Sequence, residues 1–172
     1  MGQEPEGVLA IGGNGALYGV TQYGGAVGTG ASGCLYGDGE GCGIVFELAP
    51  PAVASGSWTE TQIYAFTGQN GDGAFPVAGL LIGTDGVLFG VTELGGNPAC
   101  TDGCGTVFKL TPPASAGDPW TETILHSFSG GHDGAVPAGM LVFGRNGALY
   151  GTTFNGGNTT GGRHGTVFGL AR

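Results

Sequence analysis

The stretch LLIGTDGVLFGVTELGG at residues 80–96, followed by GTVFKLTPP at 105–113 and WTETILHSF at 120–128, decides the fold. Short runs of apolar and β-branched residues, separated by Gly, Asp and Pro, are typical of β-strands joined by turns. The same segments recur in the same order elsewhere in the chain. The sequence therefore predicts a modular repeat protein, because self-similarity at a regular spacing is the signature of repeat architectures.

Three copies of the first segment are present, and each predicts two strands joined by a tight turn. Each copy continues through a double glycine and a loop of varying length into a third strand. Two copies continue through a proline-rich connector into a fourth strand, and no segment shows helical periodicity. The predicted hairpins are VLAIGGNGALYGVTQ at 8–22, LLIGTDGVLFGVTE at 80–93 and MLVFGRNGALYGTTF at 140–154; the third strands are GIVFELA at 43–49, GTVFKLT at 105–111 and GTVFGLA at 165–171; the fourth strands are at 58–66 and 120–128.

A unit of four short antiparallel strands that returns about every 60 to 70 residues is typical of a β-propeller blade. We therefore predict an all-β fold of about three blades, at 1–79, 80–139 and 140–172, the last with only three strands. The glycine- and proline-bearing segments at 2–7 and 133–139 are predicted to be linkers between repeats. A solenoid or a two-sheet sandwich is the alternative fold.

The number of blades bears on assembly, because a propeller closes with about four to eight blades. Three blades predict either further blades in a longer chain or two chains that complete a six-bladed ring. The third unit also leaves an open strand edge, which can pair with another chain. We therefore expect a homo-oligomer or part of a longer protein, with self-assembly into filaments as the structural alternative.

Composition limits the class of partner. The 172 residues include 41 glycines, and 13 acidic side chains against 4 Lys and Arg give a formal net charge of −9. Such a chain is repelled by phosphate and by anionic lipid, so nucleic acid and membrane surfaces are excluded as expected partners. No run approaches the roughly 20 apolar residues that span a bilayer, so we expect no membrane insertion. A glycan or a protein fits the charge better.

The segments GALYGTTFNGG at 147–157, GTVFKLTP at 105–112 and HSFSGGHDGAVPAGML at 126–141 together resemble the bacterial GloVer-type glycine-rich tandem-repeat family. The resemblance covers nearly the whole chain. It implies a secreted or cell-surface protein with a propeller-like fold, since family members are exported and carry varied anchoring ends. It implies no catalytic residues. The sequence contains neither a signal peptide nor an anchor segment, which favours a fragment of a longer protein.

The four cysteines form two pairs within two of the variable loops, Cys34 with Cys42 and Cys100 with Cys104. Three disulfide pairings are formally open, and pairing within each loop requires no rearrangement of the blades. A zinc site is the alternative, for which the spacing of Cys100 and Cys104 is suitable and that of Cys34 and Cys42 is not. Export favours disulfides, because an oxidising compartment preserves them.

The loops at 24–42, 97–104 and 158–164 vary in length and chemistry while the framework does not, so we predict that they form the binding surface. The candidate binding residues are Asp38, Glu40, Asp102, Arg163 and His164.

Asp72 and Asp133 are the candidate calcium ligands, and no other cofactor is expected. The alternative is an Asp-Gly turn in which the carboxylate accepts hydrogen bonds from nearby backbone amides. The three histidines are scattered and no serine lies in a nucleophile elbow, so we expect a non-enzymatic module. The enzymatic alternative is a carbohydrate-active enzyme that uses loop carboxylates such as Asp38 and Glu40.

Overall fold

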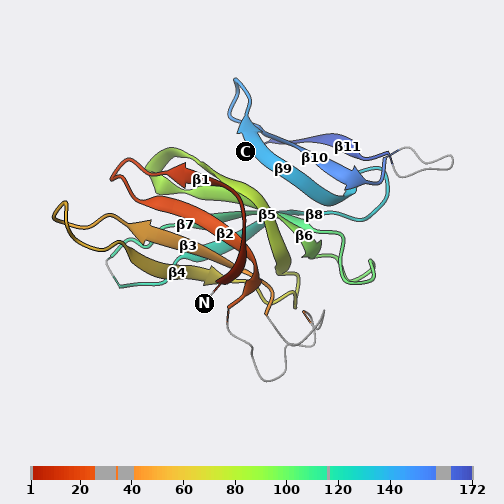
Figure 1. Cartoon of the computed structure of the whole chain (residues 1–172). Coiled ribbons are helices and arrows are strands. Elements are labelled where there is room, and N and C mark those ends of the chain that lie inside the picture. The colour runs from red at the N-terminus through yellow and green to blue at the C-terminus, as the bar shows by residue number, and fades with distance from the viewer. Residues whose placement is uncertain (1, 26–33, 35–40, 116, 158–163, 172) are drawn as a thin grey trace.

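Three antiparallel sheets follow one another along the chain in a computed structural model that describes residues 2–25, 34, 41–115, 117–157 and 164–171 (Figure 1). Each sheet is a simple meander in which sequential strands are neighbours. Sheet 1 contains β1 (Gly2–Ile11), β2 (Leu17–Gly24), β3 (Ile44–Ala49) and β4 (Thr59–Ala65); sheet 2 contains β5 (Gly73–Ile82), β6 (Leu88–Gly95), β7 (Thr106–Thr111) and β8 (Thr121–Ser127); sheet 3 contains β9 (Ala135–Phe143), β10 (Leu149–Asn155) and β11 (Thr166–Leu170). The predictions of an all-β fold and of four, four and three strands are confirmed.

Helical structure in the described residues is limited to the short 3-10 turn η1 (Thr84–Gly86) between β5 and β6. None of the described segments forms a helix long and apolar enough to cross a membrane.

The segments predicted to be linkers form the first halves of the first strands, so that interpretation was wrong. β1, β5 and β9 include Pro5, Pro76 and Pro137, which pair with residues of the second strand. Each of these strands lies at the edge of its sheet, where a proline without an N–H is tolerated, and its register shifts just after the proline. The predicted boundaries after residues 79 and 139 therefore lie inside β5 and β9.

Asparagine side chains close the first hairpins of the two outer sheets. The Oδ1 atom of Asn14 accepts a hydrogen bond from the backbone N–H of Ala16 at 3.0 Å, and Asn146 Oδ1 accepts one from Ala148 N–H at 3.3 Å. Asn and Asp are favoured in turns because their short side chains bond the backbone two residues on. These contacts stabilise the tight turns that join β1 to β2 and β9 to β10.

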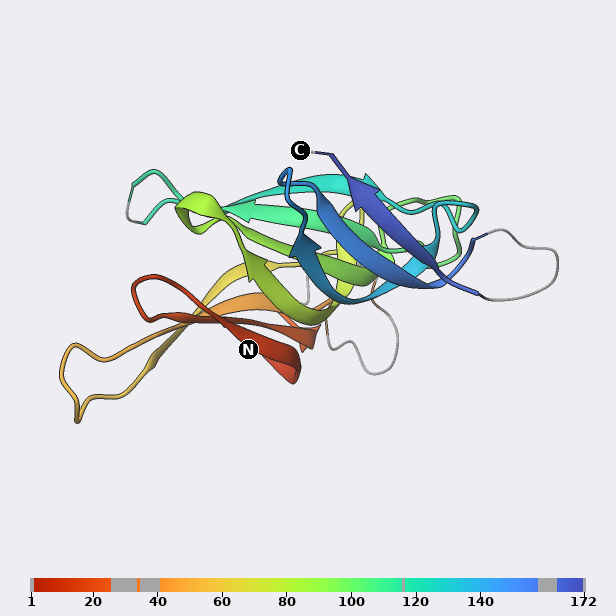
Figure 2. The same ribbon diagram turned by 90° about the horizontal axis from the view of Figure 1, so that it is seen from above.

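Sheet 2 lies between the other two sheets (Figures 1 and 2). Its first strand, β5, packs against β1 and β2, and β9 packs in the same way against β5 and β6. Each junction buries one apolar cluster. The first cluster includes Val20, Val45, Leu80 and Phe108; the second includes Phe89, Val107, Leu141 and Leu149.

The third strand of sheet 2 is covered on both faces, so that successive side chains enter different junctions. Val107 and Phe108 are both fully buried and point to opposite sheets. An aromatic pair recurs at each junction: the ring centroids of Phe66 and Phe108 lie 5.0 Å apart, and those of Phe128 and Phe168 also lie 5.0 Å apart. These edge-to-face contacts show that the repeated phenylalanines of the third strand serve packing between sheets.

Candidate functional site

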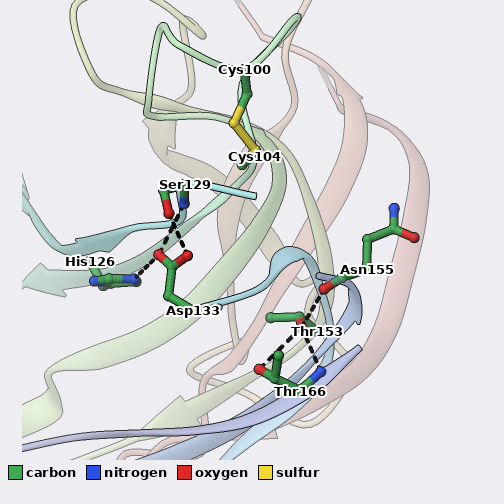
Figure 3. A network of polar contacts seen from close by, with 8 residues as sticks. All are labelled: Cys100, Cys104, His126, Ser129, Asp133, Thr153, Asn155 and Thr166. Carbon is green, nitrogen blue, oxygen red and sulfur yellow. Dashed lines mark hydrogen bonds and ion pairs between the residues drawn. A yellow bond between two sulfur atoms is a disulfide. The ribbon is translucent and has the colours of Figure 1, made fainter. Parts of the chain in front are cut away.

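The variable loops leave the sheets at the ends of β2, β6 and β10, all of which run toward the right in Figure 1. We call this side of the molecule the loop end. In each sheet, a buried threonine near the end of the second strand holds the chain in place with its hydroxyl group. The hydroxyl of Thr92 donates to the carbonyl of Leu94 at 2.9 Å and accepts from the N–H of Thr106 at 3.2 Å, which joins the two strands that flank the loop. Thr153 repeats this arrangement in sheet 3, where Figure 3 shows it with its two partners.

Disulfides close two of the loops. Cys34 is bonded to Cys42 with Cα atoms 5.2 Å apart, and Cys100 is bonded to Cys104 with Cα atoms 5.6 Å apart. This is the predicted pairing within each loop. Cys42 and Cys104 are buried, so each disulfide is anchored in the junction between two sheets.

The cysteine that ends each closed loop also holds the next sheet. The N–H of Phe75 in β5 donates to the carbonyl oxygen of Cys42 at 2.8 Å, and the N–H of Val136 in β9 donates to that of Cys104 at 2.9 Å. Both donors have positive φ, +56° and +57°. For a β-branched residue such as Val136 this is a true conformational outlier, which persists because the surrounding contacts demand it.

An open pocket of about 720 Å³ lies at the loop end between sheets 1 and 2. One wall is the β4–β5 connector and the other is the closed loop of sheet 2. The surface is made of backbone and small polar groups, with Asn70, Asn97 and Asp102 as its hydrogen-bonding side chains. The lining residues are Gly68, Asn70, Gly71, Gly95, Gly96, Asn97, Pro98, Cys100, Asp102 and Gly103.

Two carboxyl groups meet a tyrosine beneath the same connector. The hydroxyl of Tyr64 in β4 donates to Oε2 of Glu122 in β8 at 2.9 Å, which links sheet 1 to sheet 2. Asp72 Oδ2 accepts from the N–H and the hydroxyl of Thr67, at 2.7 and 2.6 Å. The other oxygens, Glu122 Oε1 and Asp72 Oδ1, are buried without a hydrogen-bond donor among the described residues.

The protonation state of Glu122 bears on why these two buried oxygens have no hydrogen-bond donor. Burial, followed by the charge of Asp72, raises the pKa of Glu122 to about 7. At neutral pH the Glu122 carboxyl is therefore protonated much of the time, and in that form it can donate a hydrogen bond to Asp72. Burial and the charges of Asp72 and Glu122 likewise raise the pKa of Tyr64, so its hydroxyl stays a donor.

The equivalent position at the next junction has different chemistry (Figure 3). His126 replaces Tyr64, and its Nε2 lies 3.2 Å from Oδ2 of Asp133. The N–H and hydroxyl of Ser129 donate to the same carboxylate, the N–H at 3.0 Å. Burial acts to raise the pKa of Asp133, and the bonds from Ser129 and His126 outweigh it, so that the pKa lies below its usual range.

Comparison with known families agrees with this repeated geometry. The model of the Gloeobacter/Verrucomicrobia repeat matches residues 1–172. The chain belongs to the Gloeobacter/Verrucomicrobia repeat family. The resemblance inferred from the sequence is thereby confirmed. A search of curated proteins gave no match.

The predicted binding residues that the structure describes lie beside two different sheets of this family member. Asp102 is exposed, lines the pocket, and accepts a hydrogen bond from Gly95 N–H through its carbonyl at 2.9 Å. His164 is exposed just before β11 of sheet 3 and does not line this pocket. Asp38, Glu40 and Arg163 lie outside the described residues.

The calcium candidates lie at different junctions. Asp72 belongs to the junction of sheets 1 and 2, and Asp133 to that of sheets 2 and 3. Each accepts a hydrogen bond from a nearby backbone amide, which is the arrangement of the turn alternative. Among the described residues, no three His, Cys, Asp or Glu side chains gather in a way that would hold a metal ion.

Tyr64 and Glu122 were not among the predicted site residues. Both lie in fourth strands that were assigned for their β propensity alone. A signal was present, because WTET is repeated while the residue six positions after the tryptophan changes from Tyr64 to His126, next to the repeated Asp72 and Asp133. A polar residue that varies in an otherwise repeated strand indicates a contact with a neighbouring unit.

Proposed function

We propose that this chain is a non-catalytic recognition module that works outside the cell and binds a glycan at its loop end. The observation that carries the proposal is the pocket shared by the closed loop of sheet 2 and the β4–β5 connector. A rigid framework that presents variable loops at one end is the usual arrangement of binding proteins. In this arrangement the sheets are blades of a propeller-type fold, and the loops at the ends of β2, β6 and β10 form one surface.

The chemistry of the pocket favours a hydroxyl-rich partner over a charged or apolar one. Asn70 and Asn97 offer amide donors and acceptors, and Asp102 offers an acceptor at the rim. The glycine-rich walls let a ligand approach the backbone closely. The pocket lining carries no cation to attract an anionic ligand.

Export is supported by the two disulfides, because such bonds persist in oxidising compartments and are rare in the cytosol. A disulfide also restricts the conformations of the closed loop, so less conformational entropy is lost when a ligand binds.

Binding without catalysis is supported by the position of the acid pair. Asp72 and Glu122 do not line the pocket, and one carboxyl oxygen of each is buried. The candidate catalytic carboxylates Asp38 and Glu40 lie outside the described residues.

A glycan array followed by titration calorimetry tests the proposal. The pocket variant combines Asp102→Asn with Asn70→Gly; both new residues tolerate the positive φ of +64° and +54° at these positions. We expect its affinity to fall about tenfold or more, since the amide of Asn70 is lost and the charged acceptor of Asp102 is replaced by a weaker neutral one.

The matched control is Asp85→Asn, an exposed aspartate with φ of +57° in the turn at the opposite end of sheet 2. Its affinity should equal that of the wild type. A wild-type chain that binds no glycan on the array contradicts the proposal. Mass spectrometry of the bound glycans completes the test, because cleavage products would support the enzymatic alternative instead.

A further inference from the structure

We propose that a second copy of this chain docks head to tail, with its β1 lying on the outer face of sheet 3. The head is the outer face of sheet 1 and includes Glu4, Leu9 and Ile11. The tail is the outer face of sheet 3 and includes Tyr150, His164 and Val167. This contact is separate from the pocket and does not depend on glycan binding.

The two internal junctions supply the geometry, because both are built from the same repeated positions. In each, the first strand of one sheet packs against the first two strands of the sheet before it. Its residue before the proline donates to the carbonyl of a cysteine, and the proline ring covers the glycine that follows this cysteine. At the second junction these residues are Val136, Pro137, Cys104 and Gly105.

The head carries the donor half of this arrangement and the tail carries the acceptor half. Glu4 and Pro5 in β1 correspond to Val136 and Pro137, and Glu4 has the same unusual φ, +54°. His164 and Gly165 correspond to Cys104 and Gly105 in the repeated segment before the third strand. The head therefore has the backbone conformation that the internal junctions use, and the tail carries the equivalent glycine, also with a positive φ, of +65°.

Exposure identifies both faces as uncovered halves of a junction. Val45 and Val107 are 0% exposed beneath the following sheet, whereas the equivalent Val167 is 78% exposed. Leu80 and Leu141 are 2% exposed beneath the preceding sheet, whereas the equivalent Leu9 is 48% exposed.

Other large apolar side chains extend both faces. Ile11 is exposed in β1, and Val142, Tyr150 and Phe154 are exposed in β9 and β10. Contiguous exposed apolar surface of this kind marks a protein contact site.

Two substitutions within the repeat favour a second copy as the occupant. Phe75 lies in one buried cluster with the Cys34–Cys42 disulfide, and Val136 packs against the cluster that contains Cys104. At the corresponding positions of the head and the tail, the apolar residue is Glu4 and the cysteine is His164. The head thus has a carboxylate where the internal junctions have an apolar side chain, and the tail has an imidazole where they have a cysteine. A carboxylate and an imidazole can pair, so the two faces remain complementary.

Each copy has one head and one tail, so two copies can form the contact twice and close a ring of six sheets. Contacts between different faces either close into rings or grow into open filaments. Six blades lie within the range of about four to eight that closes a propeller.

Sedimentation velocity on the oxidised wild-type chain and two variants tests the proposal. Leu9→Glu alters the head and Val167→Glu alters the tail. Each should dissociate to a monomer, with the dissociation constant raised about a hundredfold or more, because a carboxylate would be buried without a partner. An equimolar mixture of the two should associate more tightly than either variant alone and more weakly than the wild type, since only one of the two contacts in the mixed dimer joins an intact tail to an intact head.

Several outcomes would overturn the proposal. A wild-type monomer at the highest soluble concentration would assign these faces to neighbouring repeats of a longer chain. A dimer that survives one substitution and not the other would show a contact between two identical faces. Growth into open filaments would overturn ring closure.

Two controls complete the experiment. Val53→Glu places the same charge on an exposed valine of the β3–β4 connector and should leave the dimer intact. If Leu9→Glu lowers the melting temperature, Ile11→Glu serves as the head variant, because Ile11 is 72% exposed. Glycan titration of the monomeric variants should give wild-type affinity, which separates this contact from the proposed function.

Discussion

The backbone N–H of Phe75 donates a hydrogen bond of 2.8 Å to the carbonyl oxygen of Cys42, so the closed loop of sheet 1 holds the first strand of sheet 2. Val136 and Cys104 form the same bond at the next junction, at 2.9 Å. The disulfides therefore have two roles. Each closes a loop, and each fixes a carbonyl group on which the following sheet is aligned.

Removal of a disulfide should destabilise the whole stack. We expect the double variant Cys100→Ala and Cys104→Ala to lose about 2 kcal/mol of unfolding free energy, the chain-entropy value for so short a loop. Removal of the Cys34–Cys42 disulfide should lower the unfolding free energy slightly more, because its sequence separation is 8 rather than 4. Urea denaturation followed by circular dichroism measures both losses. Unchanged midpoints would show that the disulfides do not support the junctions.

The close approach of Gly105 to Pro137 can be tested with alanine. Gly105 and Gly71 share a φ of +89°, so alanine pays the same backbone penalty of about 1–2 kcal/mol at both positions. A Cβ at Gly105 would also collide with the proline ring, whereas one at Gly71 meets no atom within 4 Å. Gly105→Ala should therefore lose about 1–3 kcal/mol more than Gly71→Ala in urea denaturation. Equal losses would contradict the described contact.

The sequence was sufficient to predict the strands and their order, because each sheet is built from neighbouring segments. The turn residues near Asn14 and Asn146 predicted the hairpins. The first halves of β1, β5 and β9 were missed because Pro76 and its equivalents are normally signs of a break. An edge strand tolerates proline, and edge position is a property of the assembled sheet.

The candidate site was predicted only in part. The disulfides follow from loop spacing, since each pair lies within one loop. The contact of Tyr64 with Glu122 joins residues 58 positions apart in different sheets. Such a contact depends on how the sheets stack, which no local pattern encodes. The pocket has the same origin, because its two walls belong to a connector and a loop of successive units.

Backbone strain at one repeated position gives a test of stability in both directions. Gly7, Ala78 and Gly139 are equivalent, and all have positive φ. Ala78→Gly should gain up to about 1 kcal/mol, since relief of the left-handed conformation exceeds the added entropy of the unfolded chain. Gly139→Ala should lose about 1–2 kcal/mol through φ alone, because the nearest atom to an added Cβ is 3.7 Å away.

Ala114→Gly is the control for this pair, because Ala114 is exposed and is not among the residues of positive φ. It should lose about 0.4–1 kcal/mol by the entropy term. Thermal melts of the three variants measure the changes, and a loss on Ala78→Gly would show that the position is not strained.

The Glu122 and Asp72 pair should make stability depend on pH. The pKa of Glu122 is raised to about 7 in the folded chain, from 4.5 in the unfolded one. The folded state therefore holds more protons between these values, and the unfolding free energy contributed by Glu122 falls as pH rises through this window. Glu122→Gln should remove this dependence, because a neutral amide can donate to Asp72 at every pH. The unfolding free energy of the variant should exceed that of the wild type by the largest amount above pH 7.

Glu60→Gln is the matched control, since Glu60 occupies the equivalent position in β4 and is exposed. Its stability should follow the wild-type pH profile. Urea denaturation at several pH values between about 4 and 8 brackets the window set by the two pKa values. If Glu122→Gln and wild type keep a constant difference across this range, the carboxyl pair does not share a proton, and the buried oxygens of Glu122 and Asp72 have another partner.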